Sequence, residues 1–391
     1  MKRSPDMNLR PTALMVTPLL LMLGLLHTAA LAARFQLGDI FAAVGDANLN
    51  GQAEILHYRA DGTFVERLEF GAGIGGRSTG MAFDPRGNLL ATAFDRGKVV
   101  RFDNEGNNLG VFIGSGLSFP ESIVLDSAGN FYVSSVLSPI GITKFDAGGN
   151  RLARVIPGIR VDWMDLAADE QSMLFTQEMG SILRVDVSSS PGTVSDFARI
   201  GGIAFALRIL ADGSVLVANG RNIKLFDPAG VLVRTYDVEG ENLWFAVNLN
   251  PDGTSFWSGD IQSGRLFKFD IVCRGVANCT AYKQMIATGV PNQQPTRALA
   301  GLAIFGEVMA GWPRFAPFSV RDATPRLEMV PEVGVEPTRG VSLTLILRTH
   351  STAGQRVATG PDCVESIING TPCVPIRAGS DTWWPMVLAP N

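Results

Sequence analysis

The segment Gly45–Glu54 places oxygen-bearing side chains at alternating positions around a glycine, Gly51. These side chains belong to Asp46, Asn48, Asn50 and Glu54. Carboxylate and amide oxygens in such a loop suit a hard cation, so Ca²⁺ is the cofactor that this segment could hold. Two of the four ligands are neutral, and His57 stands at the last position, where a bidentate glutamate would complete the set. The alternative is a hairpin loop without metal, and we expect a structural role in either case.

Asp165 is an acid at a position where equivalent segments of the chain carry Met81, Ile123 and Leu207. A carboxylate at a core position must be paired or protonated. Arg208 directly follows Leu207, in the segment that comes after that of Asp165. The sequence therefore predicts a buried ion pair between Asp165 and Arg208. The alternative is a functional carboxylate at the centre of the fold.

Cys273 and Cys279 flank a short loop. In an exported protein, two cysteines at this spacing predict a small disulfide loop.

Four short β-patterned runs between Thr79 and Phe112 are the elements that recur along the chain. Each run ends at turn residues, because Pro fixes φ and Gly tolerates φ > 0. The third run of most copies ends in an aromatic–Asp pair, and the pairs recur about every 42 residues. They are Phe102-Asp103, Phe145-Asp146, Val185-Asp186, Phe226-Asp227 and Phe269-Asp270, with Tyr58-Arg59 as a degenerate first copy. Six four-stranded units of this length are typical of a six-bladed β-propeller.

The first unit has room for only three strands, at 38–44, 54–59 and 63–70. Its missing inner strand follows the sixth unit as Leu299–Gly306, which resembles Ser78–Phe83. The predicted fold is therefore all-β, a six-bladed β-propeller with four antiparallel strands per blade, closed by a C-terminal strand that completes the N-terminal blade. Such closure hides strand edges. A β-sandwich, the alternative, would explain neither the period nor the displaced strand.

Residues 1–32 are predicted to be a signal peptide, with basic residues at Lys2 and Arg3 and an apolar run over 13–26. Cleavage after Ala32 predicts an exported protein, periplasmic or extracellular, with no membrane span in the mature chain. An uncleaved membrane anchor is the alternative.

The propeller is predicted to span 33–307, and the chain changes character after it. Residues 308–391 hold 10 of the 22 prolines and no repeat marker, which predicts an irregular or disordered tail. The stretch Met329–Gly340 resembles a peptide made when a transfer-RNA gene is translated, so we interpret the tail as a read-through artefact. The alternative is a surface tail stapled by Cys363 and Cys373.

The net charge of -4 provides no basic footprint for nucleic acid. Loop tips of a propeller gather on its faces, so the expected partner is a protein, glycan or small-molecule ligand at one face, bound by a monomer.

Glu121 stands where the inner strand of its unit begins, at the mouth of the predicted ring. The equivalent residues of other units are Thr79, Trp163, Phe205 and Phe245.

The repeats resemble those of NHL-repeat propellers and of senescence-marker-protein/gluconolactonase-like propellers. The likeness rests on Phe119–Val133 and Gly87–Leu90, and it covers about residues 35–306. Asp162–Leu166 and Asp252–Trp257 also resemble a group of exported bacterial propellers of unassigned function. This resemblance implies the fold, and it favours a ligand- or protein-binding scaffold outside the cytoplasm.

The same resemblance provides the alternative of a metal-dependent lactonase-type hydrolase. Gluconolactonase-like enzymes hold a divalent metal in the channel with Glu, Asn and Asp from several inner strands. The comparable residues are Glu121, Asp165 and Asn248, which are the candidate catalytic residues although no motif fixes them as a set. Streptogramin lyases of similar fold use a catalytic histidine. His57 is the only histidine within 33–307 and lies on a strand away from the channel, so we do not expect a lyase.

Overall fold

The computed structural model describes residues 35–46, 53–74, 76–273, 277–290 and 297–308. These ranges belong to the first of two compact units, Met1–Pro317. The predicted signal peptide and tail lie outside the described residues and remain predictions. Within the described ranges, no helix has the length and hydrophobicity that a membrane crossing would require.

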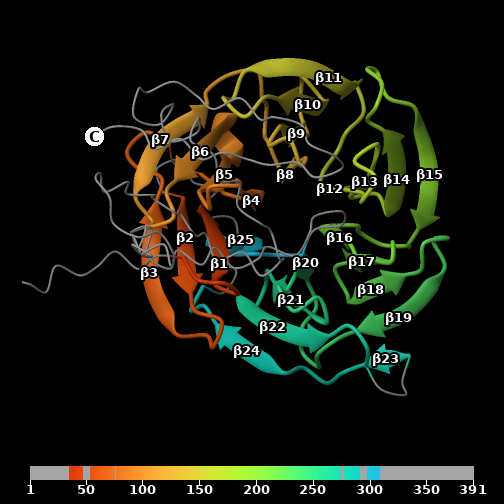
Figure 1. Cartoon of the computed structure of the whole chain (residues 1–391). Coiled ribbons are helices and arrows are strands. Elements are labelled where there is room, and N and C mark those ends of the chain that lie inside the picture. The colour runs from red at the N-terminus through yellow and green to blue at the C-terminus, as the bar shows by residue number, and fades with distance from the viewer. Residues whose placement is uncertain (1–34, 47–52, 75, 274–276, 291–296, 309–391) are drawn as a thin grey trace, which may run out of the picture. The chain divides into compact units, whose positions relative to one another are not determined.

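Six sheets surround a central axis, as predicted, and each contributes one inner strand (Figure 1). In ring order the inner strands are β25 (Arg297–Ile304), β4 (Met81–Phe83), β8 (Ile123–Leu125), β12 (Met164–Leu166), β16 (Leu207–Ile209) and β20 (Trp244–Leu249). The second strands are β1 (Ile40–Asp46), β5 (Leu89–Ala93), β9 (Phe131–Ser135), β13 (Ser172–Gln177), β17 (Val215–Ala218) and β21 (Ser255–Asp260).

The third strands are β2 (Glu54–Tyr58), β6 (Lys98–Phe102), β10 (Gly141–Phe145), β14 (Ser181–Asp186), β18 (Ile223–Phe226) and β22 (Arg265–Asp270). The outer strands are β3 (Phe64–Glu69), β7 (Asn108–Ile113), β11 (Arg151–Pro157), β15 (Val194–Arg199), β19 (Leu232–Tyr236) and β24 (Gln284–Ala287). Their pairings within the six four-stranded blades are antiparallel.

Side chains of Asp cap the tight turns that separate these strands. Asp146 Oδ1 accepts hydrogen bonds from the backbone N–H groups of Gly148 (2.9 Å) and Asn150 (2.8 Å). Gly149 has φ +83°, a conformation that side chains other than glycine rarely adopt. The turn between β4 and β5 is built in the same way by Asp84 and Asn88. These local bonds explain why the repeat could be recognised from its turn residues.

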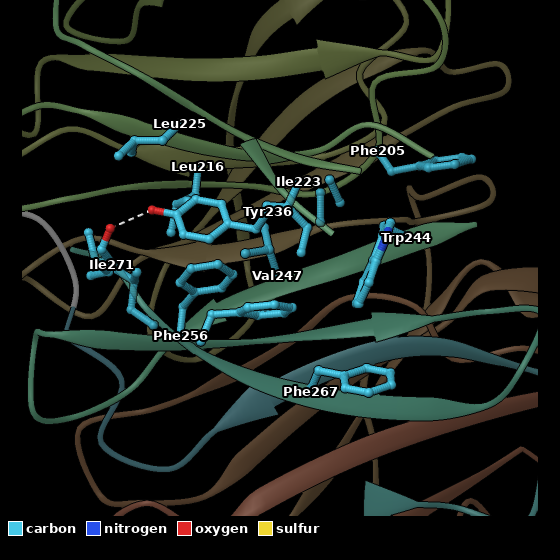
Figure 2. Close-up of a cluster of buried hydrophobic side chains, with 14 of the residues drawn as sticks. Phe205, Leu216, Ile223, Leu225, Tyr236, Trp244, Val247, Phe256, Phe267 and Ile271 are labelled. Atoms are coloured by element: carbon cyan, nitrogen blue, oxygen red, sulfur yellow. Dashed lines mark hydrogen bonds between the residues drawn. The ribbon is translucent and has the colours of Figure 1, made fainter. Parts of the chain in front are cut away.

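Aromatic side chains fill the space between neighbouring blades. Figure 2 shows this packing between the fifth and sixth blades, where Tyr236, Trp244, Phe256 and Phe267 pack together. The hydroxyl of Tyr236 donates a hydrogen bond of 2.5 Å to the carbonyl oxygen of Ile271, so the buried phenol is satisfied. Burial between blades holds the ring together, because one blade alone cannot cover both faces of its sheet.

The ring closes in the first blade. Strand β25 pairs antiparallel with β1, from Ile40 opposite Ile304 to Asp46 opposite Arg297. Strand β1 pairs in turn with β2. The C-terminal strand thus completes the N-terminal blade, which confirms the predicted closure.

A disulfide joins Cys273 and Cys279 on the outer side of the sixth blade. The short strand β23 (Asn278–Cys279) does not extend its own blade but pairs in parallel with β19 of the fifth blade. The backbone N–H of Asp237 donates to the carbonyl oxygen of Cys279 at 2.9 Å. The disulfide therefore holds a strap that links two blades.

Replacing Cys273 and Cys279 together by serine is expected to lower the free energy of unfolding by about 2 kcal/mol, because the unfolded chain loses a short covalent loop. Urea denaturation with and without a thiol reductant measures the change. The double variant serves as its own control, since reductant should destabilise only the wild type. Equal sensitivity of both proteins to reductant would show that this disulfide does not hold the strap.

Candidate functional site

Two clusters of polar side chains, each containing buried acids, lie at different levels of the inner strands. We call the first the entry cluster: Glu121, Arg160, Asp162, Trp163 and Glu178. The second, the exit cluster, contains Asp165, Arg208, Asn248 and Glu307.

The entry cluster forms where β12 begins and β13 ends, because these two strands are antiparallel. Glu178 follows β13, and its backbone N–H donates to Asp162 Oδ2 at 2.8 Å. Arg160 donates from Nε to Asp162 Oδ1 at 2.6 Å and from its terminal nitrogen to Glu178 Oε2 at 2.7 Å. Both oxygens of Asp162 are therefore engaged, and one guanidinium bridges two carboxylates.

Glu121 precedes β8 and is the most perturbed acid of the entry cluster. Burial raises its pKa well above the usual value, and the carboxylates of Asp162 and Glu178 raise it further. The guanidinium of Arg160 opposes this rise. Burial also raises the pKa of Asp162, although its bond to Arg160 counteracts the effect. The Glu121 carboxyl is therefore stabilised in its neutral, protonated form beside an acid that holds an arginine.

The indole of Trp163 is 2% exposed, and it faces the same carboxyl. Its N–H favours the ionised form of Glu121 electrostatically, but the Nε1 atom completes no hydrogen bond with any described group. A buried donor without a partner is unusual and costs about 1–3 kcal/mol. A buried carboxyl and an indole N–H without a partner thus lie close together at this point.

Aromatic rings from three blades gather beside the entry cluster. The ring centroids of Trp163 and Phe245 are 5.7 Å apart at an interplanar angle of 85°. Those of Phe205 and Phe245 are 4.7 Å apart. Each of these aromatic residues lies at or near the start of an inner strand. At this end of the inner strands, acidic side chains therefore lie next to aromatic ones.

The Glu121→Gln variant is expected to gain stability relative to the wild type as the pH rises above about 4.5, the usual glutamate value. Above that pH the unfolded chain loses the proton while the folded protein keeps it, so unfolding of the wild type becomes more favourable. The slope from one proton is at most about 1.4 kcal/mol per pH unit. Urea midpoints of both proteins between pH 4 and pH 8, converted to free energies with the measured m-value, give the difference.

Asp270→Asn, which removes an exposed acid paired with Lys283, is the control for the loss of one negative charge. A difference between Glu121→Gln and wild type that does not change with pH would contradict a protonated Glu121.

The exit cluster corrects the predicted pair between Asp165 and Arg208. Arg208 Nε bonds to Glu307 Oε1 at 2.9 Å, and no ion pair between Arg208 and Asp165 occurs among the described residues. Asp165 instead accepts hydrogen bonds from the backbone N–H groups of Ile209 (2.8 Å) and Leu166 (3.0 Å). Arg208 influences Asp165 only through its charge. The arginine turns away because Glu307, beyond the closing strand, offers a direct carboxylate.

Burial raises the pKa of Asp165 to about 6, while the nearby charge of Arg208 lowers it and that of Glu307 raises it. Glu307 also accepts from Asn248 Nδ2 at 2.8 Å and from the backbone N–H of Leu249 at 2.6 Å. These bonds attach the end of the closing strand to the fifth and sixth blades.

The three candidate catalytic residues are not one site. Asp165 and Asn248 belong to the exit cluster, whereas Glu121 belongs to the entry cluster. Asp162 and Asp165 are three residues apart on nearly extended chain, so the two levels are separated by roughly 10 Å. Asp162 and Glu178, which do meet Glu121, were missed as its partners. Comparing the residues at the start of every inner strand would have found Asp162.

The calcium loop remains a prediction, because Asn48, Asn50 and the side chain of Asp46 lie outside the described residues. The carboxylate of Glu54 accepts a hydrogen bond of 2.9 Å from Arg67. Among the described residues, no group of three or more His, Cys, Asp or Glu side chains is arranged to hold a metal ion.

His57 is fully buried in β2 and bonds to Asp39 Oδ2 through Nε2 at 2.8 Å. Its Nδ1 lies 3.1 Å from Glu66 Oε1, and its ring stacks on Phe41. Both ring nitrogens are thus engaged inside the first blade.

No protein-family model and no curated protein matches this chain. Among solved structures, a chain of a nidogen/laminin complex aligns with TM-score 0.53 and 16% identity, covering 68% of this chain and 98% of its own. A protein of unknown function from Bacteroides caccae aligns with TM-score 0.52 and 14% identity, covering 69% and 99%. A gluconolactonase from Xanthomonas campestris aligns with TM-score 0.48 and 16% identity, covering 59% and 90%. At such identities these likenesses show the fold alone, and the first two align over nearly their whole length with this six-bladed β-propeller.

Proposed function

We propose that this chain is an exported β-propeller that binds a ligand at the entry cluster and acts as a binding scaffold outside the cytoplasm. The observation that carries the proposal is the unpartnered indole N–H of Trp163, buried beside the Glu121 carboxyl at the start of neighbouring inner strands.

The propeller fold does not require an acid at this position. Equivalent residues in other blades are Thr79, Phe205 and Phe245, and those blades form the same four strands. A buried acid with a raised pKa and a buried indole N–H without a partner both lower the stability of the fold. A ligand that satisfies both groups would explain why they are there.

A lactonase-type hydrolase is the second candidate. A neutral carboxyl beside an ionised carboxylate is an arrangement that can move a proton during hydrolysis, and Glu121 and Asp162 provide it. The described residues do not fit the metal of such an enzyme, because none of their acids and histidines form a three-ligand group. We therefore place binding first and derive no step through a metal.

A thermal-shift screen of the purified protein against amines, sugars, carboxylates and lactones tests the binding proposal. A class that raises the melting temperature of the wild type but not of Glu121→Gln supports a site at the entry cluster. A shift of equal size in Glu121→Gln would place the ligand elsewhere. Lactone hydrolysis by the wild type that is lost in Glu121→Gln would instead favour the hydrolase.

Cell fractionation tests the location. We expect the protein in the periplasm or medium with Ala33 as its first residue. Protein retained in the cytoplasm with an intact N-terminus would contradict export.

A further inference from the structure

We infer that the entry cluster recognises a primary ammonium group carried on a short aliphatic stem. This inference rests on the proposed binding function and names the chemical class of its ligand.

The first argument is charge. Three carboxyl groups, of Glu121, Asp162 and Glu178, surround a single guanidinium, that of Arg160. The next arginine, Arg77, also acts on Glu121, but its guanidinium is held by Asp95, with bonds of 2.7 and 3.2 Å. The cluster therefore has more acidic groups than cations, which favours the neutral form of Glu121. A cationic ligand would take the place of the Glu121 proton.

The second argument is the indole N–H of Trp163, which needs an acceptor. The indole nitrogen completes no hydrogen bond with any described group, and a neutral carboxyl is only a weak acceptor for it. When an ammonium group lets Glu121 ionise, the carboxylate becomes a strong acceptor for the indole N–H. One cation would thus favour the Glu121 carboxylate and give the indole N–H a strong acceptor, whereas a neutral ligand would not favour the ionised carboxylate.

The third argument separates an organic cation from a metal ion. Asp162 already accepts from Arg160 and from the backbone of Glu178 with both oxygens, so it offers no free pair of ligand oxygens. The aromatic rings of Trp163, Phe205 and Phe245 stand beside the acids. Aromatic walls next to carboxylates favour an ammonium group with an apolar stem over a hydrated metal ion.

The entry cluster is partly exposed on the side of Arg160 and Glu178. The side chains of Arg160 and Glu178 are 47% and 38% exposed, whereas Glu121 itself is 5% exposed. An ammonium group arriving from this face meets the outer carboxylate first and the buried carboxyl last. Long-range attraction to the excess acid would assist its approach.

Isothermal titration calorimetry of the whole protein with n-butylamine, at neutral pH, tests the inference. We expect n-butylamine to bind and 1-butanol, its neutral analogue, to give no heat. Glu121→Gln should weaken n-butylamine binding on the order of a hundredfold, because it removes one partner of a buried charge pair. Trp163→Phe keeps an aromatic ring but removes the indole N–H, and it should weaken binding by a smaller factor.

Glu241→Gln is the matched control. Glu241 is a second buried acid paired with an arginine, Arg265, but it lies in the loop before β20, outside the entry cluster. This variant should bind n-butylamine with unchanged affinity. An equal loss in Glu241→Gln and Glu121→Gln would show a general charge effect and overturn the inference.

The source of the amine is distinguished by a short peptide that contains one lysine between glycines. Tighter binding of the peptide than of n-butylamine would indicate the lysine side chain of a protein partner. Weaker binding would indicate a free small amine. Absence of heat with both amines, or 1-butanol binding as well as n-butylamine, would overturn the inference.

These outcomes also separate the two proposals. A sugar or carboxylate that binds only when Glu121 is present would refute the ammonium group and keep the site. Ligands that bind equally to wild type and Glu121→Gln would refute both.

Discussion

A chain that ends before Arg297 is expected to lose cooperative unfolding, whereas a chain that ends after Val308 is expected to unfold like the full-length protein. The reason is the position of β25, which forms the inner strand of the first blade and pairs with β1 along seven residues. Without β25, the edge of β1 is left unpaired. The apolar side chains of Leu299, Leu302 and Ile304 are also lost from the core between the first and sixth blades.

Differential scanning calorimetry of the two shortened chains and of the full chain measures this effect. Gly301→Ala provides a test at full length, because a Cβ at this position would overlap the carbonyl oxygen of Thr79, which lies just before the next inner strand, β4. It should lower the melting temperature strongly. Similar transitions for both shortened chains would show that ring closure does not depend on β25.

The fold was predictable because its markers are local. Asp146 caps its own turn through residues two and four positions away, so the turn leaves a signal in the sequence at each repeat. The paired β-runs are also joined by short connections. The closing strand was also predictable, because its sequence resembles that of Ser78–Phe83 although it follows the sixth blade.

The entry cluster was only partly predictable. Glu121 was recognised from its place at the start of an inner strand, but Asp162 and Glu178 come from the next blade. Their meeting depends on how neighbouring blades pack, and no sequence period records that packing. The strap is similar: the cysteine spacing predicted a loop, but not that β23 would pair with β19, more than 40 residues away.

The pairing of Asp165 was wrong for an equally physical reason. The alignment of repeats correctly brought Asp165 beside the inner strand of the next blade, where it bonds to the backbone of Ile209. It could not include Glu307, which lies 99 residues from Arg208 and follows a strand displaced to the other end of the chain. Arg208 therefore pairs with Glu307, a carboxylate that is distant in sequence and lies outside the repeat.

The Arg208→Met and Glu307→Gln variants are each expected to lose about 3–5 kcal/mol of unfolding free energy, because each leaves a buried partner without its counter-charge. The side chains of Arg208 and Glu307 are 9% and 13% exposed, so water screens the pair little. Loss of Arg208 also leaves the carboxylates of Glu307 and Asp165 close together without a cation.

A double-mutant cycle by urea denaturation tests the pair. The Arg208→Met/Glu307→Gln double variant should lose much less than the sum of the two single losses. The exposed pair of Lys283 and Asp270 is the control, and its variants should change stability little.

The corresponding cycle between Asp165→Asn and Arg208→Met should give a smaller coupling, because these two side chains interact through charge without a direct bond. That coupling should also decline as the pH falls through about 6, where Asp165 takes up its proton in the folded protein. The Arg208–Glu307 coupling is the reference for this change. If the cycles show instead that Asp165 is the stronger partner of Arg208, then Glu307 does not hold the end of the closing strand. The stability of the ring would in that case depend on contacts between the fourth and fifth blades.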